Sequence, residues 1–378
     1  MNSDLCDKLG IEFPLFAFSH CRDVVAAVSK AGGFGVLGAV AHTPESLAID
    51  LQWIDEHIEG KPYGIDLLIP NKMEHKEQLI TKAALEARIP ESHRLHVESI
   101  LRDCDINIED LWDGKYDGTD YTNNLREDGA NQLLDVALNH PITMFVNALG
   151  VPPKATMARC REKGMVIGAL TGSKEHAVKH AEAGVDVLVV SGTEAGGHCG
   201  EISTMVVVPE VLQAIKDYDH MHVLAAGGIA TGAQMAACMA MGASGVWCGS
   251  VWLTTSEAET TPTVKEKMIR ATSRDTVRSR SRTGKPTRQL QSSWTNAWYQ
   301  EGAPEPLPMP LQGLISRPAL EKVDRLAASG HPGAQQLATY YVGQAVGLMN
   351  SEQSVKNIVY DFMKDYAEAV DRLNRTLD

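Results

Sequence analysis

The chain has 378 residues, of which 44% are hydrophobic and 22% are charged, so it can form a folded domain with a large apolar core. Its formal net charge of −13 at pH 7 argues against general nucleic-acid binding, which needs clustered lysine and arginine to neutralise phosphates. The sequence holds no run of 18 apolar residues, so we expect no membrane-spanning helix.

The cysteine content and the N-terminal sequence indicate the compartment. The seven cysteines are scattered and include no Cys-x-x-Cys pair, so we expect free thiols, no disulfide framework and no metal site. The first ten residues, MNSDLCDKLG, lack a basic stretch followed by an apolar run, so no signal peptide is expected. The sequence therefore predicts a soluble, cytoplasmic protein.

Short apolar runs alternate with helical patterns along most of the chain. The runs are apolar on both faces, as in parallel strands that helices cover on both sides. Crossovers of this length require parallel pairing, and eight strand-then-helix units predict a (β/α)8 barrel, an α/β fold of the TIM-barrel class. A doubly wound open sheet is the alternative, which eight strands disfavour. The expected strands begin at Phe13, Phe34, Tyr63, Thr143, Met165, Val185, His222 and Gly245.

Two segments interrupt this alternation. Residues 71–140 separate the third and fourth strands, and they are polar with acid-rich patches, so we expect a mostly helical insertion rather than a loop. In residues 274–378 the regular recurrence of apolar strand-like runs stops. The segment contains a basic run, then a proline-rich stretch and then a helical pattern. The sequence thus predicts a barrel of residues 1–273 and a C-terminal helical extension of residues 274–378 that could cover the barrel mouth.

The first candidate site is the loop SGTEAGGHCG, residues 191–200, which follows the sixth strand. Loops at the carboxyl ends of barrel strands form the active face. Gly196 and Gly197 would let the backbone approach a flat ligand closely. They would hold His198, whose imidazole, with an ordinary pKa of about 6.5, can exchange protons at neutral pH. By itself, this motif could equally be a turn with an incidental histidine.

Two further glycine-rich loops follow the seventh and eighth strands. They are AAGGIATG, residues 225–232, and GASGVWCGS, residues 242–250. Barrel enzymes build phosphate sites from these two loops and an adjacent helix N-terminus. Gly227 and Gly228 would expose backbone N–H groups to the phosphate, and Gly249 and Ser250 would complete the cradle. Each loop alone could simply end a strand, but two at consecutive strands favour the phosphate site.

The loop after the first strand is a fourth candidate. The backbone of Ala17, Phe18 and Ser19 could lie against a flat cofactor ring. His20 rivals His198 as the catalytic histidine, although a polar residue at a helix start is more often a cap or a surface group. We expect His42 and His222 to be structural.

Six lysine and arginine residues occur between Arg274 and Arg288. They could bind a phosphorylated substrate or the phosphates of a coenzyme, and would then border the substrate entrance and favour anionic substrates. More often such a run is a solvated face, or a partner for an acidic segment such as the insertion.

Together these loops resemble the nitronate monooxygenase family, formerly called 2-nitropropane dioxygenases, whose relatives include FMN-dependent enoyl-ACP reductases. The similarity covers residues 11–258 without the insertion. It is carried by AAVSKAGGFGVLG from Ala26, by AGVDVLVVSGTEAGGHCG from Ala183, and by the segment from Ala225 to Ser250. The resemblance implies a non-covalent FMN, with its phosphate on the seventh and eighth loops and His198 as the catalytic base.

Three departures from the family pattern surround the expected flavin. Many members have PMAG after the first strand, where this chain has AFSH. A common asparagine after the third strand is Asp66 here, and a common glutamine before the glycine loop is Ser191. By position, Asp66 and Ser191 are expected to contact the cofactor.

The resemblance implies an FMN-dependent oxidoreductase that oxidises alkyl nitronates with molecular oxygen. The alternative enzyme is an NAD(P)H-dependent FMN reductase or dehydrogenase acting on an enoyl or acyl thioester, in which the basic run would hold coenzyme phosphates. A non-catalytic flavin-binding protein is a third hypothesis, and it leaves His198 unexplained. The expected partners are thus a small substrate and O2 or NAD(P)H, and a homo-oligomer is left open.

Overall fold

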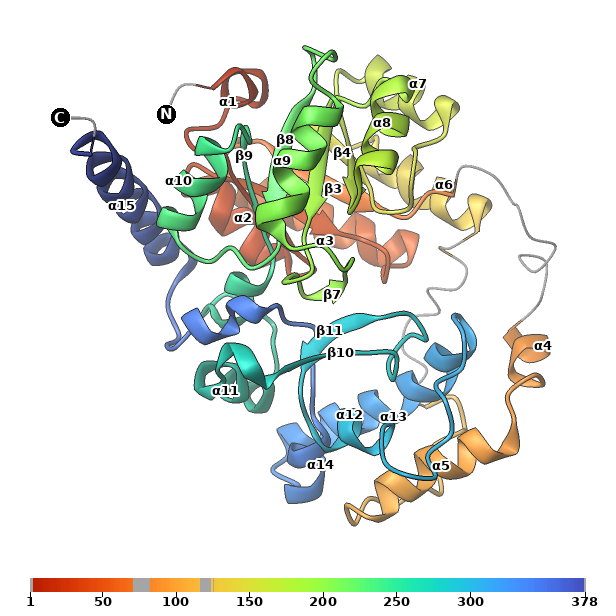
Figure 1. Ribbon diagram of the computed structural model, residues 1–378. Coiled ribbons are helices and arrows are strands. Elements are labelled where there is room, and N and C mark those ends of the chain that lie inside the picture. Colours follow the sequence, from red (N-terminus) through yellow and green to blue (C-terminus); the bar gives the residue numbers. More distant parts are fainter. Residues whose placement is uncertain (1–2, 71–81, 116–123, 125, 377–378) are drawn as a thin grey trace.

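The computed structural model describes residues 3–70, 82–115, 124 and 126–376. Eight parallel strands close into a barrel in the order β1-β2-β3-β4-β5-β6-β8-β9, with β1 paired to β9 (Figure 1). The predicted (β/α)8 barrel is therefore confirmed, and the open sheet is excluded. The barrel strands are β1 (Leu15–Ser19), β2 (Phe34–Gly38), β3 (Tyr63–Leu67), β4 (Met144–Asn147), β5 (Val166–Thr171), β6 (Val187–Ser191), β8 (His222–Ala226) and β9 (Gly245–Cys248).

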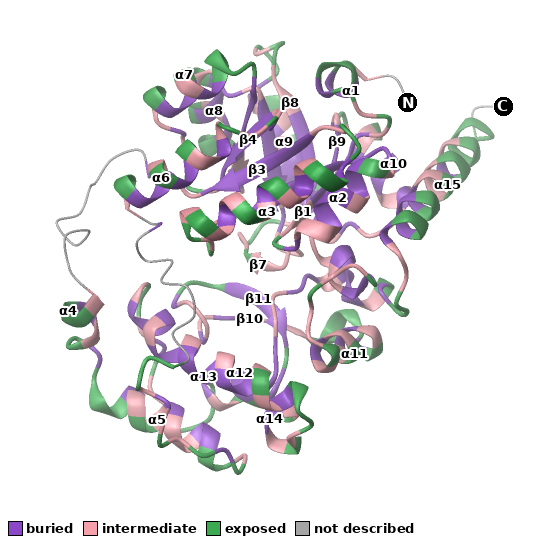
Figure 2. Cartoon of the chain, turned by 180° about the vertical axis from the view of Figure 1, so that it is seen from behind, coloured by how far each residue is buried: buried purple, intermediate pink, exposed green. Residues whose placement is uncertain are grey.

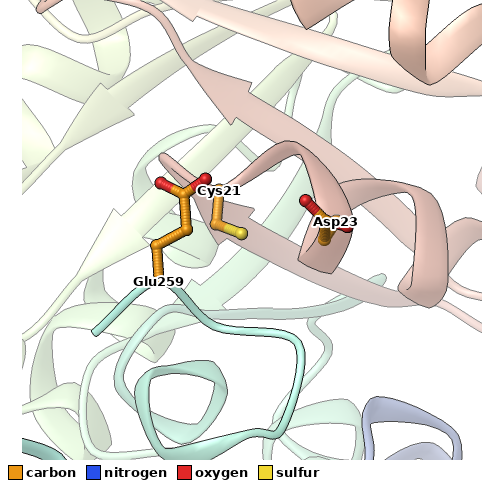
Figure 3. Close-up of side chains that lie close together, drawn as sticks. All are labelled: Cys21, Asp23 and Glu259. Atoms are coloured by element: carbon orange, nitrogen blue, oxygen red, sulfur yellow. The ribbon is translucent and has the colours of Figure 1, made fainter. Parts of the chain in front are cut away.

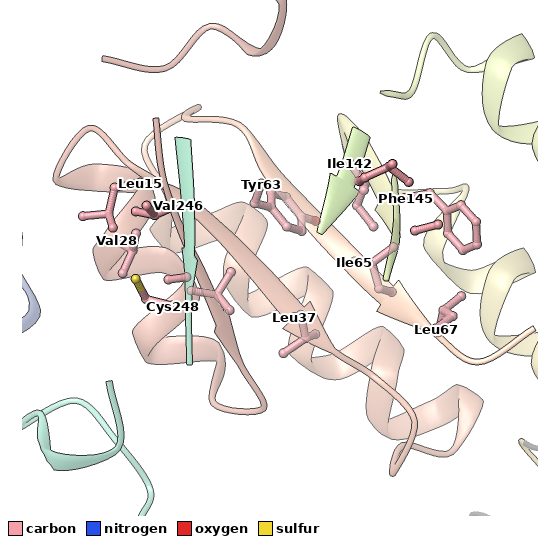
Figure 4. Packing of buried hydrophobic residues seen from close by; sticks show 14 of the residues in the cluster. Leu15, Val28, Leu37, Tyr63, Ile65, Leu67, Ile142, Phe145, Val246 and Cys248 are labelled. Carbon is pink, nitrogen blue, oxygen red and sulfur yellow. The ribbon is translucent and has the colours of Figure 1, made fainter. Parts of the chain in front are cut away.

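Side chains alternate between the two faces of each strand and form two apolar layers. The outer layer packs the strands against the surrounding helices, as Tyr63, Ile65 and Leu67 of β3 do (Figure 4). The inner layer fills the barrel, and Leu5 of helix α1 (Asp4–Leu9) joins it. The barrel strands are buried, whereas the outer helices expose polar residues (Figure 2). These helices are α2 (Arg22–Lys30), α3 (Pro44–His57), α6 (Glu127–Ala137), α7 (Lys154–Glu162), α8 (Lys174–Ala183), α9 (Thr204–Ala214) and α10 (Gly232–Ala240).

Helix α15 (Val355–Asn374) completes the ring of helices. It packs beside α10 and α2, in the place of a helix that follows the eighth strand (Figure 1). Val355, Ile358 and Phe362 form an apolar stripe with helical spacing, and the Phe362 ring stacks on Trp252 at 6.4 Å between centroids. This part of the predicted C-terminal extension thus belongs to the barrel, and the segment before it is inserted between the eighth strand and its helix.

A second apolar core lies beside the barrel mouth. It joins α4 and α5 of the insertion, through residues such as Val97 and Leu101, to residues that follow the eighth strand, such as Trp294 and Ile315, whereas α6 of the insertion packs on the barrel. Two segments that are far apart in the sequence therefore form one unit. Its helices are α4 (Lys82–Glu86), α5 (Glu91–Arg102), α11 (Pro262–Arg270), α12 (Ser293–Ala297), α13 (Leu311–Ala328) and α14 (Pro332–Leu337).

The basic run forms two strands, a result that differs from the expected loss of strand structure. Strands β10 (Thr276–Ser279) and β11 (Thr287–Leu290) are antiparallel, and β11 also pairs with β7 (Gly197–His198). The buried residues Thr287, Arg288 and Gln289 of β11 are polar, so the sequence shows no apolar pattern at this strand. Among the described residues, no helix is long and apolar enough to cross a bilayer.

Candidate functional site

The carboxyl ends of the barrel strands bring the predicted loops to one rim. Ser191 at the end of β6 is in register with Ala226 at the end of β8, and Ala226 is in register with Trp247 of β9. The loops that follow these three strands are therefore neighbours. On the other side of β9, Ala17 of β1 is in register with Cys248, so the first-strand loop joins the same rim.

His198 lies where the barrel meets the second unit. It sits on β7, which lies beside β11 (Figure 1), and it is opposite Thr287 of β11. Its Nε2 is 3.0 Å from Thr283 Oγ1. Burial lowers the pKa of His198 below its ordinary value, and the positive charge of Lys285 lowers it further. The ring nevertheless keeps exposed surface, a combination expected of a group on the wall of a recess. A neutral imidazole is thus available to a ligand at neutral pH.

Sequence reasoning did not single out Thr283, and it gave Lys285 no role apart from the basic run. Both lie in the turn between β10 and β11, where the Lys285 backbone N–H donates to Thr283 Oγ1 at 3.3 Å. Nothing local in the sequence connects this turn with His198. The connection depends on the pairing of β11 with β7, across about ninety residues of sequence.

Four arginines of the basic run have partners within the protein, namely Arg278, Arg280, Arg282 and Arg288. Arg278 donates to Cys199 O and pairs with Glu201 at 3.2 Å, so it lies against the end of the 191–200 loop. Arg280 donates to Gly284 O and Pro306 O. Arg282 donates to Thr339 O and lies 4.7 Å from the centroid of the Tyr341 ring.

The buried Arg288 donates to Thr193 O at 2.9 Å and connects β11 to the 191–200 loop. The basic run therefore contributes to the site mainly by holding neighbouring backbone segments in place. Lys285 is its exposed cation beside His198.

The loop after β8 has the backbone conformation that its glycines permit. Gly227 and Gly228 have φ values of 100° and 71°, in the left-handed region that side chains disfavour. Gln234 holds the turn: its Nε2 donates to Gly228 O at 2.7 Å, and its Oε1 accepts from Ala230 N. A Cβ at Gly228 would stand 2.9 Å from Glu194 Cβ, so the turn also packs against the 191–200 loop.

Open space lies beside Gly249, at the end of β9. A Cβ built there would meet no heavy atom within 4 Å, and its φ of −114° is ordinary. The adjacent Ser250 Oγ accepts from Gly343 N at 2.8 Å and keeps its own hydrogen for donation. Ser250 begins the 3-10 helix η3 (Ser250–Thr254). This arrangement fits a small anionic group such as a phosphate.

Asp66 places an unpartnered acid at the rim. Ile65 and Leu67 belong to the outer layer, so the side chain between them faces the barrel interior. It is 5% exposed, and its Oδ2 has no hydrogen-bond partner among the described residues. Burial raises the pKa of Asp66 well above its ordinary value, which favours the protonated carboxylic acid, a form that can donate a hydrogen bond.

The remaining cofactor candidates occupy different environments. Ala17 is buried in the outer layer, so only its backbone can face a ligand. The Phe18 ring stacks on Trp247 at 6.0 Å, and Ser19 Oγ accepts from Cys21 N at 3.0 Å. A Cβ on Gly196 would stand 2.8 Å from Gly343 N, so this glycine permits close contact with a segment of the second unit.

Gly197 and Ser191 are half-buried, and the side-chain position of Gly197 is open. The structure thus brings the predicted residues to one rim, in keeping with the expectation that they form one site.

Two other histidines have polar partners of their own. His42 Nε2 is 2.9 Å from Asp50 Oδ2, and His222 lies at the opposite, amino end of the barrel, where its Nδ1 is 3.4 Å from Ser244 Oγ. These positions agree with structural roles for both histidines.

Cys21, Asp23 and Glu259 also lie near one another, with their ligand-type atoms within 4.8 Å (Figure 3). Burial raises the pKa of the Cys21 thiol, and the thiol donates to Glu257 O at 3.2 Å. A protonated thiol is a poor metal ligand, so this cluster is better explained as packing between the first-strand loop and the 255–261 segment.

Known proteins resemble this chain in sequence and in fold. The family described as nitronate monooxygenase matches residues 2–365. A Mycobacterium tuberculosis protein, whose name assigns it to the monooxygenases without a substrate, is 49% identical over 99% of this chain and 98% of its own length.

Solved structures show the same fold. Nitroalkane oxidase from Streptomyces ansochromogenes has a TM-score of 0.78 at 24% identity, covering 98% of this chain and 100% of that one. FabK from Thermotoga maritima has a TM-score of 0.70 at 24% identity, covering 100% of this chain and 99% of the other. At such identities the likeness concerns the fold alone.

Proposed function

Because the chain belongs to the nitronate monooxygenase family, we propose that it is an FMN-dependent enzyme that oxidises alkyl nitronates with molecular oxygen. The observation that carries the proposal is the position of His198. A neutral imidazole, with an exposed lysine nearby, stands on the same rim as two glycine loops suited to a phosphate. An anionic substrate at this rim would meet Lys285 and His198 together.

The donor groups at the rim fit FMN. The space beside Gly249, with the Ser250 hydroxyl and the Gly227–Gly228 turn, would take the phosphate. The neutral Asp66 would offer a hydrogen bond to a polar edge of the ring, as an amide does. When bound, FMN would supply the electron chemistry that links nitronate oxidation to oxygen.

The protein's own residues would bind and orient the substrate. Lys285 would attract the nitronate oxygens, and His198 would hold them or take the α-proton from a neutral nitroalkane. The pairing of β7 with β11 fixes the loop that carries His198. The second unit, which supplies β11, would limit the access of water to the reacting centre.

The decisive experiment is anaerobic mixing of the purified protein with propionate 3-nitronate and, separately, with NADPH. The proposed function predicts that the nitronate bleaches the flavin absorbance rapidly and that later admission of oxygen restores it. Bleaching by NADPH alone would instead support the reductase acting on an enoyl or acyl thioester.

We expect the protein to be yellow and to release FMN, not FAD, on denaturation. The loops after β8 and β9 would form one phosphate cradle at the rim, and FMN needs only one. Chromatography of the released flavin is the measurement. Stoichiometric FAD, or no flavin after reconstitution, would contradict the assignment.

Replacing Lys285 by methionine should raise the KM for an anionic nitronate and leave the KM for a neutral nitroalkane nearly unchanged. Lys285 is exposed and close enough to His198 to lower the pKa of the ring, so its charge reaches the site. The expected change is about 3- to 30-fold, the range of one partly screened charge contact, and it should shrink in high salt.

Arg280→Ala is the matched control, because the Arg280 guanidinium is bonded to Gly284 O and Pro306 O instead. Equal KM changes for the charged and neutral substrates in the Lys285 variant would show that this lysine has no electrostatic role in binding.

A further inference from the structure

A second histidine, His20, stands at the rim with one ring nitrogen free. Its Nδ1 lies 2.8 Å from Gly38 O. A carbonyl oxygen only accepts hydrogen bonds, so the hydrogen of the neutral ring is on Nδ1 and the lone pair is on Nε2. Within the described part of the chain, Nε2 has no hydrogen-bond partner, and the residue keeps exposed surface. The tautomer that this contact selects is the one that can accept a proton at Nε2.

Aromatic contacts also hold the ring in place. The His20 ring meets Phe18 edge to face at 5.1 Å between centroids, and Phe18 stacks on Trp247. A Cβ at Gly38 would stand 2.8 Å from the His20 ring, so a glycine is needed beneath it. A side chain that only capped a helix or faced solvent would not need this support. His20 is therefore a preorganised group.

The position of His20 complements that of His198. His20 follows β1, which is three strands away from β6 around the barrel, so the two histidines approach the rim from different sides. Gly38, which anchors His20, is in register with Asp66, and Ala17 is in register with Cys248, next to Gly249. His20 thus stands between the two places where the cofactor would be held.

The two histidines differ in their readiness to accept a proton. His198 Nε2 is already bonded to the Thr283 hydroxyl, and Lys285 disfavours a second positive charge there. His20 has a free Nε2, and its titratable neighbour is His42 of the loop after β2, whose Nε2 contacts Asp50. Burial lowers the pKa of His20, so the neutral, proton-accepting form prevails at neutral pH.

We propose that His20 is a second catalytic residue, which accepts the α-proton of a neutral nitroalkane at Nε2 while His198 and Lys285 hold the nitro oxygens. This inference rests on the proposed function. In the step, the α C–H bond breaks, the proton goes to His20 Nε2, and the electron pair stays on the substrate as the nitronate. The imidazolium then returns its proton to solvent. A substrate supplied as the nitronate needs no such step.

The test compares His20→Gln with His198→Gln, using nitroethane and preformed ethyl nitronate as substrates and oxygen consumption as the readout. His20→Gln should lower kcat/KM for nitroethane by about 10²-fold or more, the usual worth of a positioned base, and change that for ethyl nitronate by less than about 3-fold. His198→Gln should lower both. A loss through poor folding would affect both substrates equally, so the ratio separates chemistry from stability.

Flavin content and thermal unfolding are measured for each variant, and His20→Asn replaces His20→Gln if the latter does not fold. An unchanged ratio of the two substrates, in variants of an enzyme that oxidises ethyl nitronate, would overturn the role of His20 and leave the proposed function standing. If the wild-type protein oxidises neither substrate, the proposed function fails, and this inference fails with it.

Discussion

Replacing His198 by alanine should leave the flavin bound and lower the turnover of both nitroalkanes and nitronates by about 10²–10³-fold, the usual effect of removing one group that stabilises charge on substrate oxygens. The substitution removes one hydrogen bond, that to Thr283, and His198 is exposed, so the cost in folding free energy should be small. His198 also lies on β7, outside the Gly227–Gly228 turn and the space beside Gly249. Steady-state oxygen consumption and the flavin spectrum of the same preparation measure both effects.

The pH profile offers a second check on His198. Burial and Lys285 both lower the pKa of this histidine, so the neutral ring prevails at pH 7. Activity that depends on the neutral ring should therefore be constant at neutral pH and fall only below the ordinary histidine value of about 6.5. Thr283→Val, which keeps His198 but removes its partner, should give a smaller loss than His198→Ala. Unchanged turnover in His198→Ala would remove this residue from the mechanism.

The barrel could be predicted because its strands are buried on both faces. Such strands have continuous apolar runs, such as VLVV in β6. The regular separation of these runs by helical patterns indicates parallel pairing. The candidate site could be located for a related reason. Parallel strands place all their carboxyl ends at one rim, so motifs after the sixth, seventh and eighth strands had to be neighbours.

The contacts of His198 could not be predicted, because they depend on pairing between distant segments. Strand β11 contains buried Thr287, Arg288 and Gln289, which show no apolar alternation, and Thr287 and Arg288 bond to backbone oxygens within the protein. The basic run illustrates the same limit. Its charges are visible in the sequence, but their directions are not, and the structure places the Arg282 guanidinium over the Tyr341 ring.

Helix α15 shows how a visible pattern can have an unexpected partner. Its apolar stripe predicts a helix with one buried face, and the structure confirms this. The sequence alone did not reveal that this face packs on the barrel, about one hundred residues after the eighth strand. The intervening segment belongs to the second unit, and its strand β11 pairs with β7 in the 191–200 loop.

Gly249→Ala should weaken flavin binding by about 5- to 150-fold without destabilising the flavin-free protein. The added methyl group meets no protein atom within 4 Å, and φ at this position is −114°, so the fold accepts alanine. If the cofactor phosphate occupies this space, the methyl group must crowd it, and overpacking costs about 1–3 kcal/mol. Fluorescence titration of the flavin-free protein with FMN measures the affinity, and thermal unfolding measures the stability.

Gly228→Val is the comparison variant for Gly249→Ala. At Gly228 the φ of 71° is strained for a β-branched residue, and the new Cβ would stand 2.9 Å from Glu194 Cβ. This variant should therefore lose flavin and also lower the unfolding temperature of the flavin-free protein, because the turn itself must distort. Gly249→Ala should lose affinity alone. Wild-type affinity in Gly249→Ala would mean that the phosphate lies elsewhere on the rim, since only an empty space can accept a methyl group at no cost.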